Sequence, residues 1–212
     1  MQSRPSGIGF READAKRPDA LERVLLLARE GDRDATSTLL RSLAPHLMRT
    51  VRLVLGPRHS EIEDATQEAA YGVLTALWRY RGECTVLHFC CRIAVLTAMN
   101  VRRRETVRLH KAADLNVTMS DLASYQEGKT PEQHALAELC ARAVRELLGV
   151  LPEAQAEALA LHHVLGMTTD EIAAATDAPI ETVRSRLKLG RRALRERVLE
   201  HPQLREALSK EA

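Results

Sequence analysis

The stretch MTTDEIAAATDAPIETVRSRL, residues 167–187, predicts two helices separated by a tight break. The first is expected over 169–176 and is capped by Thr168 or Thr169, because threonine hydroxyls suit the N-cap position. The second is expected to begin at Pro179, since proline is favoured in the first turn of a helix.

The residues around the break are typical of a helix-turn-helix. Asp177 takes the turn position usually held by glycine, and aspartate tolerates left-handed backbone better than most residues. Ala173 is expected where the two helices cross closely, and Val183, ten residues later, is expected to fill the same core. A helix-turn-helix is therefore the clearest local structure that the sequence predicts.

The helix that begins at Pro179 carries an apolar stripe between two basic flanks. The stripe comprises Ile180, Val183, Leu187, Leu194 and Val198. The flanks comprise Arg184, Lys188, Arg192 and Arg195 on one side, and Arg186 and Arg197 on the other. We expect the stripe to dock on the domain while the flanks face outward, either as a solvated surface or as a surface for nucleic acid.

The charge distribution favours nucleic acid. Residues 179–199 carry seven basic and two acidic side chains, whereas residues 152–178 carry five acidic side chains and no Lys or Arg. Positive charge is thus concentrated on the helix that a helix-turn-helix places in the major groove. The candidate DNA-binding residues are Thr182, Arg184, Ser185, Arg186, Lys188, Arg191 and Arg192.

The composition predicts an all-α protein. Of 212 residues, 45% are hydrophobic and only 3% aromatic, and β-branched runs bounded by turn residues are absent, which favours helices over strands. The formal net charge is only +2. No apolar signal segment and no run of 18 apolar residues is present, so we expect a cytoplasmic protein without a membrane span.

Hydrophobic periodicity predicts further helices on both sides of a polar segment. Their expected ranges are 19–31, 34–55, 60–80, 85–111, 132–151 and 152–165. Pro45 is expected to kink or divide the second of these helices. Ser60 with Glu63 predicts a capping box at the start of the third.

The polar segment 112–131 has no apolar face and gathers Asp, Ser, Asn, Gly and Pro, so it predicts a flexible linker between two small helical domains. The expected segments are a flexible arm at 1–17, a domain at 18–111, the linker at 112–131, a second domain at 132–202 and a tail at 203–212.

No cofactor and no metal site is predicted. The four cysteines lack C-x-x-C spacing, and the adjacent pair Cys90 and Cys91 lies in an apolar helical setting that favours core packing. His162 and His163 are neighbours on one helix, so their side chains point about 100° apart and cannot readily share a metal.

The helix expected at 60–80 has two unlike faces. The apolar face comprises Ile62, Ala65, Ala69, Val73 and Leu77. The opposite stripe comprises Asp64, Gln67, Glu68 and Tyr71. An acidic stripe that ends in an aromatic residue is either a protein-binding face or an ordinary solvated face.

The following helix ends in NVRRRETVRLHK, residues 100–111, which forms a second basic surface. Its basic residues are Arg102, Arg103, Arg104, Arg108 and Lys111, against Glu105. Two basic surfaces on two tethered helical domains indicate one protein that contacts DNA at two places.

Three long stretches resemble one family: 28–56, AREGDRDATSTLLRSLAPHLMRTVRLVLG; 61–94, EIEDATQEAAYGVLTALWRYRGECTVLHFCCRIA; and 151–198, which contains the helix-turn-helix. The chain resembles the sigma factors of bacterial RNA polymerase of the extracytoplasmic-function type, in the sigma-70 family. The resemblance covers about residues 19–200.

The resemblance implies a promoter-binding function without catalysis, so no enzyme is expected. The first domain would be a sigma region 2 bundle, in which Asp64, Gln67 and Glu68 bind the clamp helices of the largest polymerase subunit. The second would be a sigma region 4 domain that contacts the minus-35 element and the flap of the second-largest subunit. The residues implied at the minus-10 element are Arg81, Phe89, Arg92, Asn100, Arg102, Arg103 and Arg104. An anti-sigma protein is a candidate further partner.

The chain departs from the family within the implied minus-10 region. Phe89 stands where many relatives carry Trp, and Val95 and Leu96 replace a usual Arg-Asn pair. Either the preferred promoter differs, or strand capture relies more on Arg92, Asn100 and the 102–104 cluster.

Two other classes of function compete with this interpretation. A conventional helix-turn-helix regulator would bind a palindrome as a dimer without polymerase, and the stripe at Asp64, Gln67 and Glu68 argues against it. A helical enzyme or a protein-binding adaptor is the other alternative, and the lack of a clustered catalytic set argues against the enzyme.

Overall fold

A computed structural model describes residues 18–111 and 131–200, and every regular element in these ranges is a helix. The first half contains α1 (Pro18–Arg29), α2 (Arg33–Leu55), α3 (Ile62–Ala76), the 3-10 helix η2 (Leu77–Arg79) and α4 (Val86–Lys111). The second half contains α5 (Pro131–Val150), α6 (Glu153–Val164), α7 (Thr169–Thr176) and α8 (Ile180–Glu200). The prediction of an all-α fold is confirmed.

The core of the first half is built around α2. Its leucines at positions 39, 43 and 47 recur every four residues, so they share one face, and all three are fully buried. This face packs against α4 and α3. The apolar face predicted at Ile62, Ala65, Ala69, Val73 and Leu77 is buried as well.

Pro45 does not divide α2. The helix continues from Arg33 to Leu55 with Pro45 inside it, so of the two predicted outcomes the division is wrong, and the kink stays a prediction. A proline inside a helix costs roughly 3 kcal/mol. Pro45 lies on the exposed side, and the buried leucines Leu43 and Leu47 hold the helix against the core on both sides of it.

The predicted capping box at Ser60 is also wrong. The N-cap residue of α3 is Glu61, without a side-chain cap. The backbone N–H of Glu61 donates to His59 Nδ1 at 3.1 Å. The His59 imidazole therefore accepts the hydrogen bond from the N–H of the N-cap residue. The α-helix ends at Ala76, and η2 completes the range expected to reach Tyr80.

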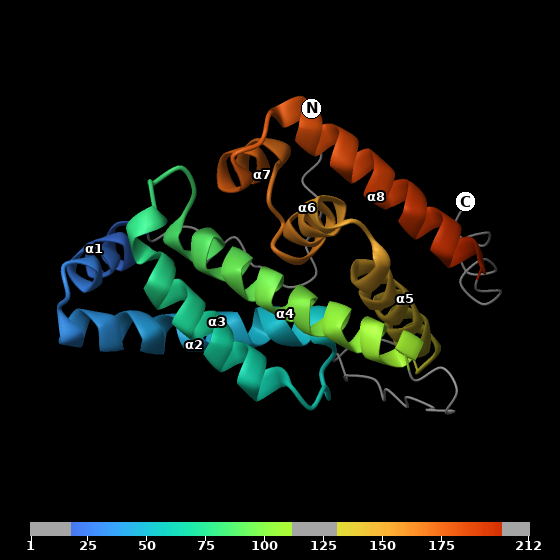
Figure 1. The fold of residues 1–212 in the computed structure, drawn as a ribbon, viewed down its shortest axis with the longest axis horizontal. Coiled ribbons are helices and arrows are strands. Elements are labelled where there is room, and N and C mark those ends of the chain that lie inside the picture. Colours follow the sequence, from blue (N-terminus) through green and yellow to red (C-terminus); the bar gives the residue numbers. More distant parts are fainter. Residues whose placement is uncertain (1–17, 112–130, 201–212) are drawn as a thin grey trace.

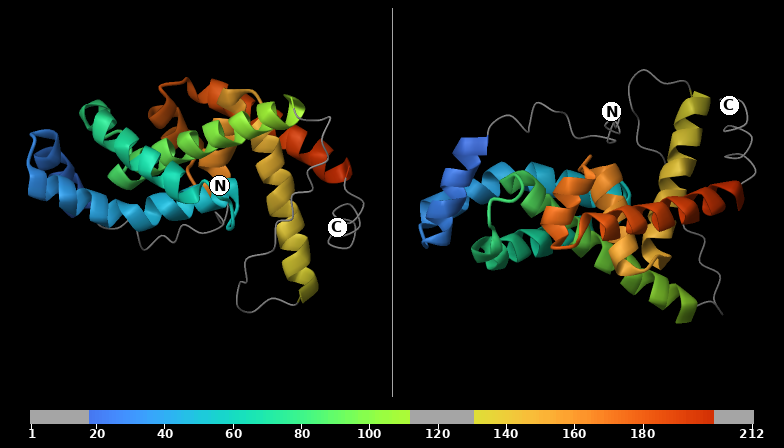
Figure 2. Two further views of the ribbon diagram at one scale, coloured as in Figure 1. Left: turned by 60° about the horizontal axis from the view of Figure 1, so that its bottom comes forward. Right: turned by 90° about the horizontal axis from the view of Figure 1, so that it is seen from above.

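The second half is organised around α6, which contacts α5, α7 and α8. Its buried residues include Leu159 and Leu161. The crossing with α8 is close, because a Cβ at Gly190 would lie only 3.4 Å from Leu159 Cδ1. In Figures 1 and 2, α8 forms the outer edge of the second half, on the side away from α2 and α3.

The two halves pack against each other. α4 contacts α5 and α6, and α2 contacts α6, so α4 lies between the first bundle and the second half in Figure 1. Their buried residues form one continuous hydrophobic cluster. The predicted arm and tail, and all but the last residue of the predicted linker, lie outside the described residues.

Candidate nucleic-acid interface

The turn between α7 and α8 has helix-turn-helix geometry. Thr168, one of the two predicted caps, accepts the Glu171 N–H at 3.3 Å, and the Glu171 carboxylate accepts the Thr168 N–H at 2.8 Å. Asp177 adopts left-handed backbone with φ 50° and ψ 43°. Val183 is fully buried. The short helix, its cap, the left-handed turn and the buried valine are as predicted.

The apolar stripe and the larger basic flank of α8 divide as predicted, whereas the smaller flank, Arg186 and Arg197, is half-buried. Val183 and Leu187 are buried, and the rest of the apolar stripe is half-buried. The larger flank is exposed throughout, at Arg184, Lys188, Arg192 and Arg195. On the other flank, Arg197 binds Glu146 of α5 at 2.7 Å, so this end of α8 is tied to its own half.

Most of the candidate DNA-binding residues on α8 face solvent. The exposed ones are Arg184, Ser185, Lys188, Arg191 and Arg192, and the half-buried ones are Thr182 and Arg186. Arg184 pairs with Glu181, and Arg192 pairs with Glu196 at 2.8 Å. Both carboxylates belong to α8 itself, and such exposed pairs within a helix contribute little, so a phosphate can replace them.

Arg191 also makes a contact that the sequence did not indicate. Its Nη2 lies 2.7 Å from His162 Nε2, and His162 Nδ1 lies 2.9 Å from the carbonyl oxygen of Met167. Because a guanidinium only donates, Nε2 is the acceptor of this bond, and Nδ1 is the donor to the Met167 carbonyl. This bond ties α8 to α6.

His163 packs edge-on against His162, with ring centroids 4.9 Å apart. Burial, and then the nearby His162 and Arg191, lower the pKa of His163 to about 4. Within the described ranges, no cluster of His, Cys, Asp and Glu side chains has the arrangement needed to hold a metal ion.

The stripe predicted on α3 is exposed at Asp64, Gln67 and Glu68. Tyr71 extends it and has 69% of its surface exposed. Glu68 lies 3.7 Å from Arg104 of α4, with more than half of both side chains exposed. The stripe is therefore available to a protein partner.

The residues predicted at the minus-10 element fall into two groups. Arg81, Asn100 and Arg104 are exposed, whereas Phe89, Arg92, Arg102 and Arg103 are half-buried. Arg92 pairs with Glu157 at 2.8 Å, and Arg103 pairs with Glu153 at 3.1 Å. Both carboxylates belong to α6, in the other half of the chain, and no local sequence pattern indicates these pairs.

Aromatic residues surround the start of α4. Phe89 packs edge-on against Tyr80, with centroids 5.4 Å apart, and the Tyr80 hydroxyl donates to the Cys84 carbonyl at 2.8 Å. Burial raises the pKa of Tyr80 to about 12. Trp78 is 62% exposed, with the Arg79 guanidinium 5.0 Å from its ring centroid. An exposed indole and a half-buried Phe89 are the kinds of groups on which unpaired bases stack.

The departure at 95–96 changes the core and not an exposed surface. Val95 is fully buried and Leu96 half-buried.

Cys90 and Cys91 are also fully buried, as predicted for core packing, whereas Cys140 is exposed. Burial raises the pKa of the Cys91 thiol to about 11. No helix within 18–111 and 131–200 is long and apolar enough to cross a membrane.

Comparison with known proteins places the helix-turn-helix in a family. Residues 141–194 match the model described as sigma-70, region 4. The chain is 32% identical over 154 residues to the RNA polymerase sigma-H factor of Pseudomonas aeruginosa, covering 69% of this chain and 77% of the relative. It is 30% identical over 142 residues to the ECF RNA polymerase sigma-E factor of Escherichia coli K12, covering 65% and 74%.

Two solved structures share the fold. One is CnrH in complex with the cytosolic domain of CnrY, with a TM-score of 0.52 at 20% identity, covering 84% of this chain and 96% of that one. The other is the sigma factor RpoE of Bartonella quintana in complex with the anti-sigma factor NepR, with a TM-score of 0.50 at 17% identity, covering 76% and 95%.

Proposed function

The chain belongs to the extracytoplasmic-function sigma factors of the sigma-70 family, and from that premise we propose that it binds core RNA polymerase and directs it to a specific set of promoters. There it supports DNA opening and the initiation of transcription. The named relatives are sigma factors, and none of them is a dimeric helix-turn-helix regulator. Their role in initiation involves no reaction of their own, so we propose no active site.

The observation that carries this proposal is the exposed basic flank of α8. Arg184, Lys188 and Arg192 project from the second helix of a helix-turn-helix, where base edges and phosphates of a major groove come within reach. We assign the region 4 role and minus-35 binding to residues 132–202. The polymerase flap would contact the same domain.

For residues 18–111 we propose the region 2 role. The exposed stripe at Asp64, Gln67 and Glu68 would bind the polymerase clamp helices. The basic and aromatic residues that begin at Arg81 and end at Arg104 would hold the unstacked minus-10 strand, since basic grooves with aromatic side chains suit single strands. We place this action in the cytoplasm, where the polymerase works.

An anti-sigma protein is part of the proposal. The two similar structures were solved with CnrY and with the anti-sigma factor NepR bound. We propose that a protein of this kind also binds the present chain.

The test is transcription in vitro with core polymerase and a library of promoters. The chain is expected to produce transcripts from defined positions. The double variant Asp64→Lys/Glu68→Lys is expected to lose association with core polymerase, because the stripe would carry the wrong charge, while it keeps the helical circular dichroism of the unmodified chain.

Its matched control is Glu30→Lys/Asp34→Lys, which reverses two exposed carboxylates at the other end of the first bundle. The control is expected to co-purify with polymerase like the unmodified chain. Unchanged co-purification of the Asp64/Glu68 variant would refute the assigned clamp contact, and a chain that starts no transcript would refute the function.

A further inference from the structure

One buried imidazole joins three helices of the second half. His162 lies in the last turn of α6, with only 7% of its surface exposed. Its Nδ1 donates to the carbonyl oxygen of Met167 at 2.9 Å, and Met167 directly precedes Thr168, the N-cap of α7. On the other side of the ring, Nε2 accepts from Nη2 of Arg191 at 2.7 Å. The ring therefore links α6, the turn that opens the helix-turn-helix, and α8.

The turn that presents the Met167 carbonyl is itself well defined. Gly166 has φ 69°, a left-handed backbone that glycine adopts without strain. The N–H of Met167 donates back to the Leu161 carbonyl at 3.2 Å, a pattern that closes many helix C-termini. The Met167 side chain is fully buried. This carbonyl holds the imidazole of His162 in one orientation, in which Nε2 faces α8.

Arg191 differs from its neighbours on α8 in what holds it. Arg184 pairs with Glu181, and Arg192 pairs with Glu196, so a carboxylate offsets each of these charges. Among the residues that the structure describes, no carboxylate pairs with Arg191. An imidazole that accepts a hydrogen bond carries no negative charge. It therefore fixes the guanidinium and leaves the positive charge uncompensated.

The position of Arg191 on α8 suits a phosphate of the DNA backbone. Arg191 lies seven residues after Arg184 on nearly the same side of the helix, which is roughly 10 Å further along. Since a major groove is about 12 Å wide, Arg191 reaches its sugar-phosphate rim when the turns around Arg184 lie among base edges. The Arg191 side chain is exposed, and a guanidinium has several N–H donors besides the one that His162 accepts.

We propose that His162 is a positioning residue for promoter binding, which holds the Arg191 guanidinium so that its remaining N–H donors bind a backbone phosphate of the minus-35 duplex. The inference rests on the proposed function and adds to it a buried residue that makes no DNA contact of its own. A phosphate contact adds affinity and fixes the register of the protein on the duplex, but it carries no sequence information. A guanidinium that is already held in place loses less side-chain entropy on binding.

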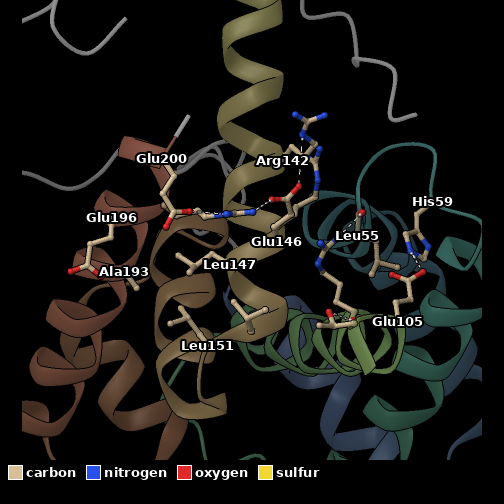
Figure 3. Close-up of a pocket in the computed structure, with 15 residues that line it drawn as sticks. Leu55, His59, Glu105, Arg142, Glu146, Leu147, Leu151, Ala193, Glu196 and Glu200 are labelled. Atoms are coloured by element: carbon tan, nitrogen blue, oxygen red, sulfur yellow. Dashed lines mark hydrogen bonds and ion pairs between the residues drawn. The ribbon is translucent and has the colours of Figure 1, made fainter. Parts of the chain in front are cut away.

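The far end of α8 is fastened independently of His162, so the helix stays seated when the imidazole is replaced. Arg197 binds Glu146 of α5 at 2.7 Å and Glu200 of its own helix at 2.8 Å. Figure 3 shows Glu200 and Glu146 on the two sides of this contact. A variant at His162 therefore changes the place of Arg191 without releasing α8.

The test uses the complex of the chain with core polymerase and a labelled promoter duplex recovered from the transcription library. His162→Leu is expected to weaken binding about fourfold and to lower the slope of log affinity against log salt by about one, because one phosphate contact is lost. A scrambled duplex is expected to weaken by the same factor. His162→Gln, whose amide oxygen can accept from Arg191, is expected to bind within about twofold of the unmodified chain.

A double-variant cycle shows whether the imidazole acts through Arg191. In the Arg191→Ala background, His162→Leu is expected to change the affinity by less than about 1.5-fold. In the Arg192→Ala background, the matched control at the next position, the loss of about fourfold is expected to persist. Equal losses in the two backgrounds, no loss with His162→Leu, or a loss of discrimination between promoter and scrambled duplex would overturn the inference.

Arg191→Lys decides the matter if His162→Leu does not fold. A lysine keeps the charge, but its single ammonium cannot reproduce the fork that reaches the ring and a phosphate together, so about threefold weaker binding is expected. Arg192→Lys is expected to change the affinity by less than about 1.5-fold. Equal binding by Arg191→Lys and the unmodified chain would overturn the inference. If the unmodified chain starts no transcript from any promoter, it is the proposed function that fails.

Discussion

The two basic helices, α4 and α8, carry similar side chains but use them differently. On α8 the arginines Arg184 and Arg192 pair only with glutamates one turn away on the same helix. On α4 the arginines Arg92 and Arg103 pair with carboxylates from α6. The basic flank of α8 is therefore open to solvent, whereas the basic face of α4 also joins the two halves.

The largest expected effect concerns the apolar side of α8, which holds the helix in place without help from its charges. Leu187→Ala is expected to lower the free energy of unfolding by about 3 kcal/mol, because a side chain with 2% exposure leaves a cavity. Urea denaturation measures the change. Leu189→Ala, at an exposed leucine two residues on, is the control, and a similar loss there would contradict the assigned faces.

The next effect separates the two sets of arginines. Arg92→Ala is expected to cost about 2 kcal/mol of stability, because it leaves the Glu157 carboxylate buried without its partner. Arg184→Ala is expected to cost less than about 0.5 kcal/mol, since its pair is exposed. Urea denaturation of the two variants gives the comparison, and equal losses would show that α4 and α8 do not differ in this way.

Arg184 is expected to matter for DNA instead. Arg184→Ala should cost about 1–2 kcal/mol of discrimination between promoters if its guanidinium contacts a base, and should weaken all promoters evenly if it contacts only phosphate. Competition binding with a preferred and a scrambled duplex distinguishes these results. Arg195→Ala, on the same flank but nearer the C-terminal end, is expected to leave discrimination unchanged.

The last effect concerns pH and the contact between α6 and α8. The folded chain keeps His163 neutral down to about pH 4, whereas an unfolded histidine titrates near pH 6.5. The unfolded state therefore binds more protons between these values, and stability falls as the pH drops through this window. About 1–2 kcal/mol is expected, since part of the ring is open to solvent. His163→Gln should flatten the dependence of the unfolding free energy on pH in this window, which denaturation at several pH values measures. An unchanged slope would show that other groups cause the effect.

The helices could be predicted from the sequence because their signals are local. The helix at 169–176 and the turn at Asp177 are predicted from a capping threonine, apolar periodicity and a turn residue that lie within a few positions of one another. The structure shows both the helix and the turn as predicted. At Pro45 the helix is not divided, because buried leucines in α2 outweigh a local preference. At Ser60 the predicted capping box is absent because the N-cap of α3 is Glu61, one residue later than expected.

The pairing of the halves left no such local signal. Arg92 and Glu157 are 65 residues apart, and nothing within either helix indicates the other. The excess of acidic residues over 152–178 was visible, but only the fold shows that two of them, Glu153 and Glu157, face the basic side of α4. The assignment of individual residues to promoter or polymerase stays a prediction, because the exposure and charge of a side chain do not indicate which of the two partners it contacts.

The crossing at Gly190 gives α8 two unequal ends. A helix of 21 residues is about 30 Å long, far more than the roughly 12 Å width of a major groove. The glycine lets Leu159 approach the middle of the helix closely, and Arg197 fastens the last turns to Glu146. Under the proposed function, the turns before Gly190 would enter the groove, and the angle at which they arrive would be set by how the rest of the helix is seated on α5 and α6.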